Sequence, residues 1–476
     1  MGPIPWSKQR FDPSFLHLLL SGSWMNQLVT LFHLLVLVLT LSTAARAQDR
    51  ITGRRLTLDE CIAIGLERSL DVRQSQAAAS EASARLSAAF GAYLPSVDIN
   101  ANYNRQLTNL RTQFSIINGV PVVGQPLPNT YGLNGQLNLT LFNGFQREAN
   151  FDAAKLNLNA TAGDIAFSKT STRFTITRQY IELLRRTQVL NARRESRALA
   201  VATLERVKAL FEAGTGRAQD VSSQEAELGN IDVSLVQAEN DVVAGRAQLL
   251  AAMNIDAMQE IDVDDRSVSQ DVPASQVKAF RTTIGSESEQ AERALMRRGD
   301  LQAAKDRTSA AAESVVGARS GYYPSITATS GYTWRNFTIA DFDRQGQTFA
   351  GLFIQIPVFD RFVTRARIAQ AELSHTQNEL QTERIRNQIR ADLRTAFGQL
   401  ELAERGLEIS ARAITFATTN ANAARERFAA GAATLIELQN SNNQLITAQI
   451  NRVTAVYAYH SAVAAVEFAT GLSEGK

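Results

Sequence analysis

The sequence predicts a mainly α-helical chain with a small β portion, in which one helix-strand-strand-long helix-turn-helix plan occurs twice. One observation is a proline-free, mostly polar run that follows an alternating strand-like segment and stops at a glycine. A second is its recurrence: Phe142 to Gly214 spans 214 − 142 = 72 positions, and Phe359 to Gly431 spans 431 − 359 = 72. Each run would form a helix about 100 Å long. Such helices are too long for an ordinary globule, so they must span a distance.

Composition argues against several classes of function. The chain has 476 residues, 20% of them charged, and a net charge of +2, so nothing indicates a nucleic-acid partner. Cys61 is the single cysteine, which rules out an intrachain disulfide and a cysteine metal cluster. His375 and His460 each stand alone on polar helical runs without a second ligand at metal-site spacing. We therefore expect no catalytic residue, no metal, no cofactor and no enzymatic activity.

The amino terminus has the features of an export signal. An apolar core from Leu28 to Leu41 precedes Ala45-Arg46-Ala47, a small-residue cleavage pattern. We assign residues 1–47 to a presequence and signal peptide, starting at Met1 or at Met25. An uncleaved anchor is the alternative, but the apolar stretch is shorter than the ~20 residues that a spanning helix needs. Past Gln48 no apolar run reaches that length, so insertion of the mature chain into a membrane would have to use strands.

The first repeat is assigned to residues 48–253. We expect strands at about 95–106 and 131–142, a long helix at about 143–212 and a turn, here called the tip, at 213–217. Both strands alternate between apolar and polar residues, so one face is expected to be apolar and the other wet. The residues expected on the wet face are Asp98, Asn100, Asn102, Asn104, Asn134, Gln136, Asn138 and Thr140.

The second repeat is assigned to residues 286–471, after a linker at 254–285 and before a tail at 472–476. Its expected strands cover about 324–336 and 349–359, its long helix about 361–429 and its tip 430–434. Pro95 to Phe142 spans 47 positions and Pro324 to Phe359 spans 35, so the difference falls in the strand-to-strand loop. Pro357 is expected at a strand end or a bulge.

A second helix follows each tip and carries a heptad seam. In the first repeat the seam positions are Val221, Leu228, Ile231, Leu235, Ala238, Val242, Gly245 and Leu249. After one seven-residue step their spacing alternates between three and four, which is typical of left-handed helix packing. A shift of 217 positions gives a second seam that is apolar or small except at Arg452.

Four strands cannot close a membrane barrel by themselves, and an open sheet edge cannot face lipid. The chain is therefore expected to share a barrel with copies of itself. Two copies would give eight strands and little lumen, whereas three would give twelve and four would give sixteen. The wet faces would line the lumen, and the helical hairpins would extend the barrel as a tube.

With this plan the sequence resembles the TolC-like outer membrane efflux proteins, from Leu56 to Gly471. The resemblance is carried by the duplicated plan, by Tyr93-Leu94-Pro95 and its copy at 322–324, by Phe142-Asn143-Gly144, and by the two tip segments. It implies a homotrimer with a 12-stranded outer-membrane β-barrel continued by a periplasmic α-helical barrel. It also implies a periplasmic adaptor and an inner-membrane transporter of RND or ABC type as partners.

The resemblance also suggests roles for the tips. It implies that adaptor hairpins dock at Ala213, Gly214, Thr215, Ala430, Gly431 and Ala432. Six positions after each tip glycine stands an acid, Asp220 or Glu437, and these are expected to form a gate of carboxylates in a trimer. They could equally be ordinary first-turn acids that complement the helix dipole.

An arginine that ties neighbouring helices shut at the second tip is often part of the family pattern. Here the comparable positions hold Ala432 and Ala433, with Arg217 and Asn440 as weaker candidates for tip contacts.

The predicted function is the outer-membrane exit duct of a tripartite efflux system, which passively conducts small toxic compounds and is gated at the helical tip. One alternative is the duct of a type I polypeptide secretion system. Another is a non-conducting periplasmic coiled-coil scaffold, although the alternating strand faces argue against it.

Overall fold

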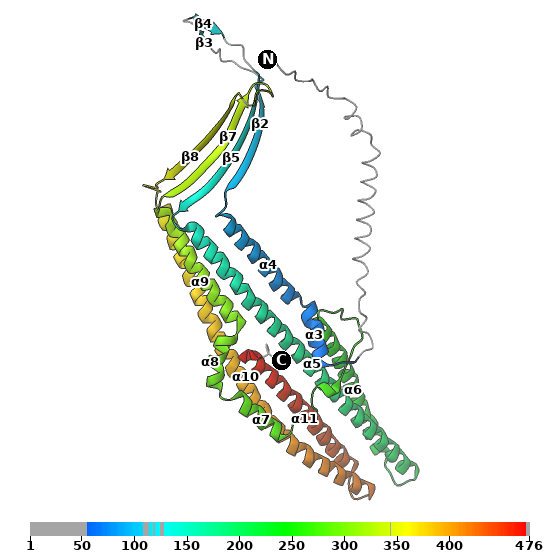
Figure 1. Ribbon diagram of the computed structural model, residues 1–476. Helices are drawn as coiled ribbons and strands as arrows, with labels where there is room; N and C mark the ends of the chain where they lie inside the picture. Colours follow the sequence, from blue (N-terminus) through cyan, green and yellow to red (C-terminus); the bar gives the residue numbers. More distant parts are fainter. Residues whose placement is uncertain (1–54, 108–113, 118–119, 124–127, 343, 473–476) are drawn as a thin grey trace, which may run out of the picture. The chain divides into compact units, whose positions relative to one another are not determined.

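The computed structural model describes residues 55–472 except 108–113, 118–119, 124–127 and 343 (Figure 1). The predicted signal peptide lies outside these residues. The helices are α3 (Leu58–Arg68), α4 (Leu70–Gly91), α5 (Gln146–Glu212), α6 (Ala218–Ala252), α7 (Ala274–Ile284), α8 (Glu287–Arg297), α9 (Gly299–Arg319), α10 (Val363–Ala429) and α11 (Leu435–Thr470), with 3₁₀ turns η1 (Asp265–Ser267) and η2 (Ser320–Tyr322). The strands are β1 (Arg55–Leu56), β2 (Ser96–Arg105), β3 (Phe114–Ile117), β4 (Val120–Val123), β5 (Asn129–Asn143), β6 (Asp262–Val263), β7 (Ser325–Asn336) and β8 (Gly346–Gln355).

The two long helices, α5 and α10, have 67 residues each. Each starts a few residues later than predicted, because a left-handed corner separates strand from helix. Phe145 and Phe362 both have φ of 67°, and the residues before them, Gly144 and Arg361, are also at positive φ. At Gly144 a Cβ would lie 2.7 Å from the carbonyl oxygen of Ser320, so this corner requires glycine.

β2, β5, β7 and β8 form an antiparallel sheet in the order β2-β5-β7-β8 (Figure 1). The register pairs Asp98 with Gln136 and Asn100 with Asn134, which places the predicted wet residues of both strands on one face. The Thr333 hydroxyl donates to Asn134 Oδ1 at 2.9 Å and extends the polar face to β7. Two edges, on β2 and β8, have no neighbouring strand within the described chain.

The sheet differs from the prediction at β8. The strand predicted over 349–359 ends at Gln355, so Ile356 and Val358 lie beyond it. Pro357 explains the early end, because proline cannot donate to a ladder. The same strand places Phe349 on the polar face, where its ring would touch a Cβ at Gly331. This aromatic covers a glycine in the neighbouring strand.

Two segments contain more structure than predicted. Strands β3 and β4 form a hairpin within residues 106–130, which were expected to be a loop. The predicted linker, 254–285, contains β6, η1 and α7. It is not a free linker, because β6 pairs with β1 and the hydroxyl of Tyr180 lies 2.7 Å from the carbonyl oxygen of Asp264.

Each repeat begins with two helices, where the sequence indicated one. Ser69 separates α3 from α4 and caps α4 by accepting from the Val72 amide. Arg298 separates α8 from α9 and is buried between the rings of Phe167 and Phe468, with its guanidinium carbon 5.4 Å from each ring centre. Its nitrogens bind Asp300 at 2.7 Å and Asp392 at 3.1 Å.

The helices after the tips use the predicted seams. The α6 seam residues are buried or half-buried, as are those of α11. Arg452, the exception in the second seam, donates to the Leu407 carbonyl at 3.0 Å and pairs with Asp271 at 2.9 Å. The stem of this arginine can therefore lie along the seam while its head is bonded.

Among the described residues, no helix combines the length and the apolarity that crossing a membrane requires.

Candidate functional site

The first tip joins α5 to α6 through a tight turn. Gly214 has φ of 75°, and its amide donates to the Phe211 carbonyl at 2.9 Å. The amides of Thr215 and Gly216 both donate to the Leu210 carbonyl, at 3.0 and 2.8 Å. A Cβ at Gly216 would lie 2.7 Å from the Phe211 nitrogen, so the turn closes too tightly for a larger residue.

The second tip, between α10 and α11, has the same form. Gly431 has φ of 72°, its amide donates to the Phe428 carbonyl at 3.1 Å, and the Ala432 amide donates to the Arg427 carbonyl at 2.8 Å. Thr434 caps α11 by accepting from the Glu437 amide at 3.2 Å. All six tip residues predicted to contact an adaptor are exposed: Ala213, Gly214, Thr215, Ala430, Gly431 and Ala432.

The two tip acids have different surroundings. Both are half-buried and lie in the first turns of α6 and α11. Glu437 forms an ion pair with Arg427, at 2.5 Å, so its charge is compensated within the hairpin. For Asp220 we find no ion pair within the described residues. The gate prediction treated the two acids alike, and the geometry distinguishes them.

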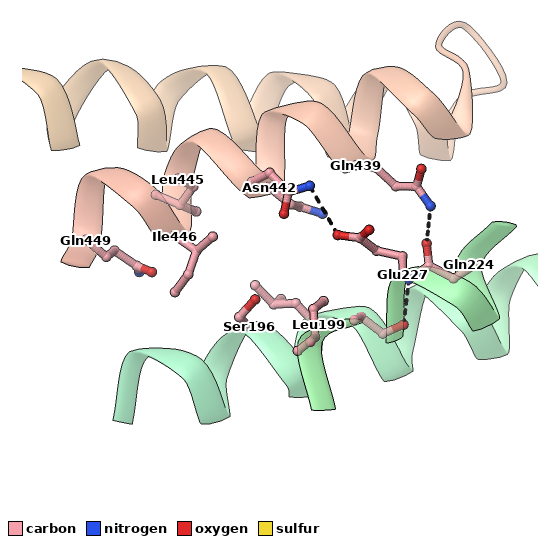
Figure 2. Close-up of a pocket in the computed structure, with 12 residues that line it drawn as sticks. Ser196, Leu199, Gln224, Glu227, Gln439, Asn442, Leu445, Ile446 and Gln449 are labelled. Carbon is pink, nitrogen blue, oxygen red and sulfur yellow. Dashed lines mark hydrogen bonds between the residues drawn. The ribbon is translucent and has the colours of Figure 1, made fainter. Parts of the chain in front are cut away.

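A set of hydrogen bonds joins the two helical hairpins near the tips; we call it the polar junction (Figure 2). Gln439 Nε2 donates to Gln224 Oε1 at 2.9 Å, and Gln224 Nε2 donates to the Ala200 carbonyl at 3.1 Å. Asn443 Nδ2 donates to Glu227 Oε1 at 3.1 Å. These bonds connect α11 with α5 and α6.

Residues of the polar junction line part of a small pocket. Its volume is about 30 Å³, and Leu199 and Ile446 are among its apolar lining residues (Figure 2). Arg206 donates to the Ala429 carbonyl at 3.2 Å and adds a contact between the hairpins closer to the tips. Arg217 and Asn440, the weaker candidates for tip contacts, form no side-chain hydrogen bond or ion pair within the described part of the chain.

The residues of the polar junction were not predicted from the sequence, although one signal was available. The single seven-residue step in the α6 seam, from Val221 to Leu228, skips Gln224, which is 2% exposed. The matching step in α11 skips Ser441, which is also buried. A polar residue at a seam position must find a partner, because burial without one is costly.

Within the described residues, no group of three or more His, Cys, Asp and Glu side chains is arranged to hold a metal ion. His460 donates from Nε2 to the Ser269 carbonyl at 2.9 Å, which is a structural contact. His375 faces Glu379 one turn further along α10, at 3.9 Å.

Known proteins are similar to most of the described chain. The sequence profile described as "Outer membrane efflux protein" matches residues 62–254 and 291–472. The outer membrane efflux protein BepC of Brucella suis biovar 1 (strain 1330) is 24% identical over 372 residues, which cover 78% of this chain and 77% of BepC. The outer membrane protein TolC of Vibrio cholerae serotype O1 is 24% identical over 305 residues, 63% of this chain and 67% of TolC.

Among solved structures, the outer membrane protein VceC of Vibrio cholerae has a TM-score of 0.72 at 17% identity, covering 87% of this chain and 96% of VceC. At this identity the likeness shows the fold alone.

Proposed function

This chain belongs to the outer membrane efflux protein family, and on that premise we propose that it is the exit duct of a tripartite efflux system. It is an outer membrane protein with a periplasmic extension. In the proposed duct, three copies form a 12-stranded barrel continued by a periplasmic helical barrel, and small toxic compounds pass through without any chemistry. The family is one of channels and not of enzymes.

The observation that carries the proposal is the sheet. It has two open edges, one polar face and one apolar face, and two 67-residue helices continue from it. An open edge in lipid leaves backbone groups without partners, whereas closure with two further sheets satisfies them. The lumen would then be lined by Asp98, Asn100, Asn102, Asn104, Asn134, Gln136, Asn138 and Thr140.

Particle images and planar-bilayer recordings test the duct together. We expect a three-fold cylinder in detergent and discrete conductance steps, small while the tips are closed. Three-fold particles that produce no channels would refute conduction and favour the scaffold. A detergent-independent monomer would refute the duct altogether.

The gate is proposed at the tip acids, with Asp220 dominant. Arg427 compensates the charge of Glu437, whereas Asp220 has no ion pair within the described residues. The carboxylate of Asp220 therefore offers the stronger site for a cation. Asp220→Asn should therefore relieve block by multivalent cations more than Glu437→Gln does. Equal relief by the two variants would refute the dominance of Asp220. No relief by either variant would leave both acids as first-turn residues that complement the helix dipole.

Docking of a periplasmic adaptor is proposed at the six exposed tip residues, with a transporter of RND or ABC type behind it. Small side chains at the turns let another helix approach closely. Ala432→Trp should abolish cross-linking to the cognate adaptor while the trimer persists. Ala350→Trp, on the distant strand β8, is the matched control for a bulky substitution; loss of cross-linking in both variants, or in neither, would count against the tips.

A further inference from the structure

Two contacts between helices occur once in the chain, although the duplicated plan would predict each of them twice. Helix α5 packs against α4 of its own repeat, and α10 packs against α9 in the same way. Helix α5 also packs extensively against α9 and α11 of the second repeat. The counterparts of those two contacts would join α10 to α4 and α6, and within the described residues α10 has no extensive contact with either.

The faces that lack a partner carry exposed apolar side chains at heptad spacing. On α6 they are Val236 and Val243, and on α10 they are Leu402, Ile409 and Phe416, each 59–73% exposed. Exposed apolar residues in a row along a helix indicate a protein interface. A groove of about 560 Å³ between α10 and α11 includes Leu402 and Ile409 in its lining.

The two rows lie at matched distances from their tips. Val236 is 236 − 214 = 22 residues after Gly214, and Ile409 is 431 − 409 = 22 residues before Gly431. Val243 and Leu402 are both 29 residues from their tip glycines, by 243 − 214 and 431 − 402. Because α6 leads away from its tip and α10 leads toward its own, the two helices would run antiparallel with these residues level.

A third pair of residues is predicted from the corresponding contact inside the chain. Leu199 on α5 and Ile446 on α11 line the same cavity, and each is 15 residues from its tip glycine, by 214 − 199 and 446 − 431 (Figure 2). The repeat-related residues are Phe416 and Gly229, at 431 − 416 = 15 and 229 − 214 = 15. Two medium side chains inside the chain correspond to one large residue and one without a side chain.

We propose that α6 of one chain docks antiparallel in the α10–α11 groove of a second copy, in three layers that pair Gly229 with Phe416, Val236 with Ile409, and Val243 with Leu402. The proposal rests on the proposed function, since a ring of copies supplies the neighbour. It goes beyond that function by fixing which faces meet and in what register. We call this contact the chain-to-chain seam.

The same repeat relation extends the seam toward the sheet. Inside the chain, α5 and α9 cross at Gly163 and Gly299, where a Cβ on either would lie 2.5 Å from the other's carbonyl oxygen. The related residues are Leu380, at 380 − 359 = 163 − 142 = 21, and Leu70, at 95 − 70 = 324 − 299 = 25. Both leucines are more than 60% exposed. In the ring they would meet between α10 and α4 of neighbouring copies.

Cysteine pairs test the register. Cys61 is fully buried, so it does not compete in disulfide formation. Val236→Cys with Ile409→Cys should give oxidised dimers and trimers on non-reducing gels, because the two residues are level. Val236→Cys with Leu402→Cys, displaced by seven residues or about 10 Å along the helix, is the matched control. It should stay monomeric on the gel, since a disulfide requires Cα atoms within about 7 Å.

A steric pair tests the Gly229 layer. Among the described residues of a single chain, none has an atom within 4 Å of a Cβ at Gly229, so Gly229→Leu leaves the lone chain unstrained. In the ring the leucine would meet Phe416 of the neighbour, and the trimer dissociation constant should rise at least about five-fold. Phe416→Ala in the same chain should restore the trimer.

The outcomes separate the seam from the duct. Three-fold particles without a Val236–Ile409 crosslink would overturn the seam and leave the duct standing. Equal crosslinking in the matched and displaced pairs would also overturn the register, as would a trimer that is indifferent to Gly229→Leu. Monomeric wild-type particles would overturn both the seam and the proposed function.

Discussion

Replacing Gln439 by leucine removes the donor to a buried amide oxygen and should weaken the polar junction. In the native chain Gln439 Nε2 lies 2.9 Å from Gln224 Oε1, and Gln224 is only 2% exposed. Without this donor the oxygen is left buried and unpaired, while Gln224 Nε2 keeps its bond to the Ala200 carbonyl. The variant therefore isolates one acceptor.

The magnitude follows from the cost of an unpaired buried polar group, about 1–3 kcal/mol. If this bond exists in the closed duct and breaks on opening, the ratio of open to closed channels rises roughly 5- to 150-fold. The double variant Gln224→Leu with Gln439→Leu removes both polar partners and replaces them by apolar contact. The free-energy difference between the closed and open states should then be close to its native value. The double variant should therefore open about as often as the native protein does.

Single-channel open probability in planar bilayers measures this ratio. Gln377→Leu, at an exposed position of α10 without a side-chain partner in the described chain, controls for the change of residue type. We expect Gln439→Leu to be open more often than the control and the double variant to be close to it. If the double variant opens as readily as the single one, the unpaired oxygen is not the cause and the reasoning fails.

Three further predictions concern stability and are measured by thermal unfolding in detergent. Gly163→Ala places a Cβ 2.5 Å from the Gly299 carbonyl oxygen and should lower the free energy of unfolding by about 1–3 kcal/mol. Gly398→Ala, where a Cβ has open space around it, should be neutral or stabilising. Equal effects of the two changes would argue against a tight crossing. Arg298→Met removes the guanidinium that pairs with Asp300 and Asp392, and it should lower the free energy of unfolding by about 3 kcal/mol. A second change, Asp392→Asn, should recover part of that loss. No recovery would mean that packing of Arg298 between the two phenylalanines dominates. Burial lowers the pKa of His460 below its ordinary value of 6.5, so the unfolded chain binds the proton more readily than the folded chain does. Stability should therefore fall as pH drops through about 6.5. His460→Gln should reduce this dependence of stability on pH, and an unchanged dependence would assign it to other groups.

The local periodicity of the sequence predicts much of the fold. The heptad seams, the tip glycines and the alternating strands each follow from short-range spacing, because a helix repeats every 3.6 residues and a strand every two. Because the plan is duplicated, each element can be predicted twice, once in each repeat. For this reason the two tip turns and their acids could be located before the structure. The docking role of the six exposed tip residues came from the family resemblance, and it is still a proposal, as is the role of the acids.

Contacts between distant segments could not be found in this way. The bond from Arg206 to the Ala429 carbonyl joins residues 223 positions apart, and the one from Gln439 to Gln224 joins residues 215 apart. Neither has a local sequence signature beyond the interrupted seam step at Gln224. The left-handed corners at Phe145 and Phe362 were missed for a related reason: positive φ is unusual for phenylalanine, and each corner is packed by an edge-on aromatic neighbour, Phe142 or Phe359.

Divergence between the repeats makes the two kinds of contact in the proposed ring unequal. Inside the chain, amide side chains bridge the hairpins from Gln439 to Gln224 and from Asn443 to Glu227. The repeat-related positions across the chain-to-chain seam hold Ser222 with Ser441 and Ala226 with Gln444. Serine is too short to replace the first bridge and alanine has no polar group for the second. Apolar layers must therefore hold the chain-to-chain seam near the tips. Because hydrogen bonds fix geometry more strictly than apolar contact does, the chain-to-chain seam is the one of the two that can slide without leaving a buried polar group unpaired.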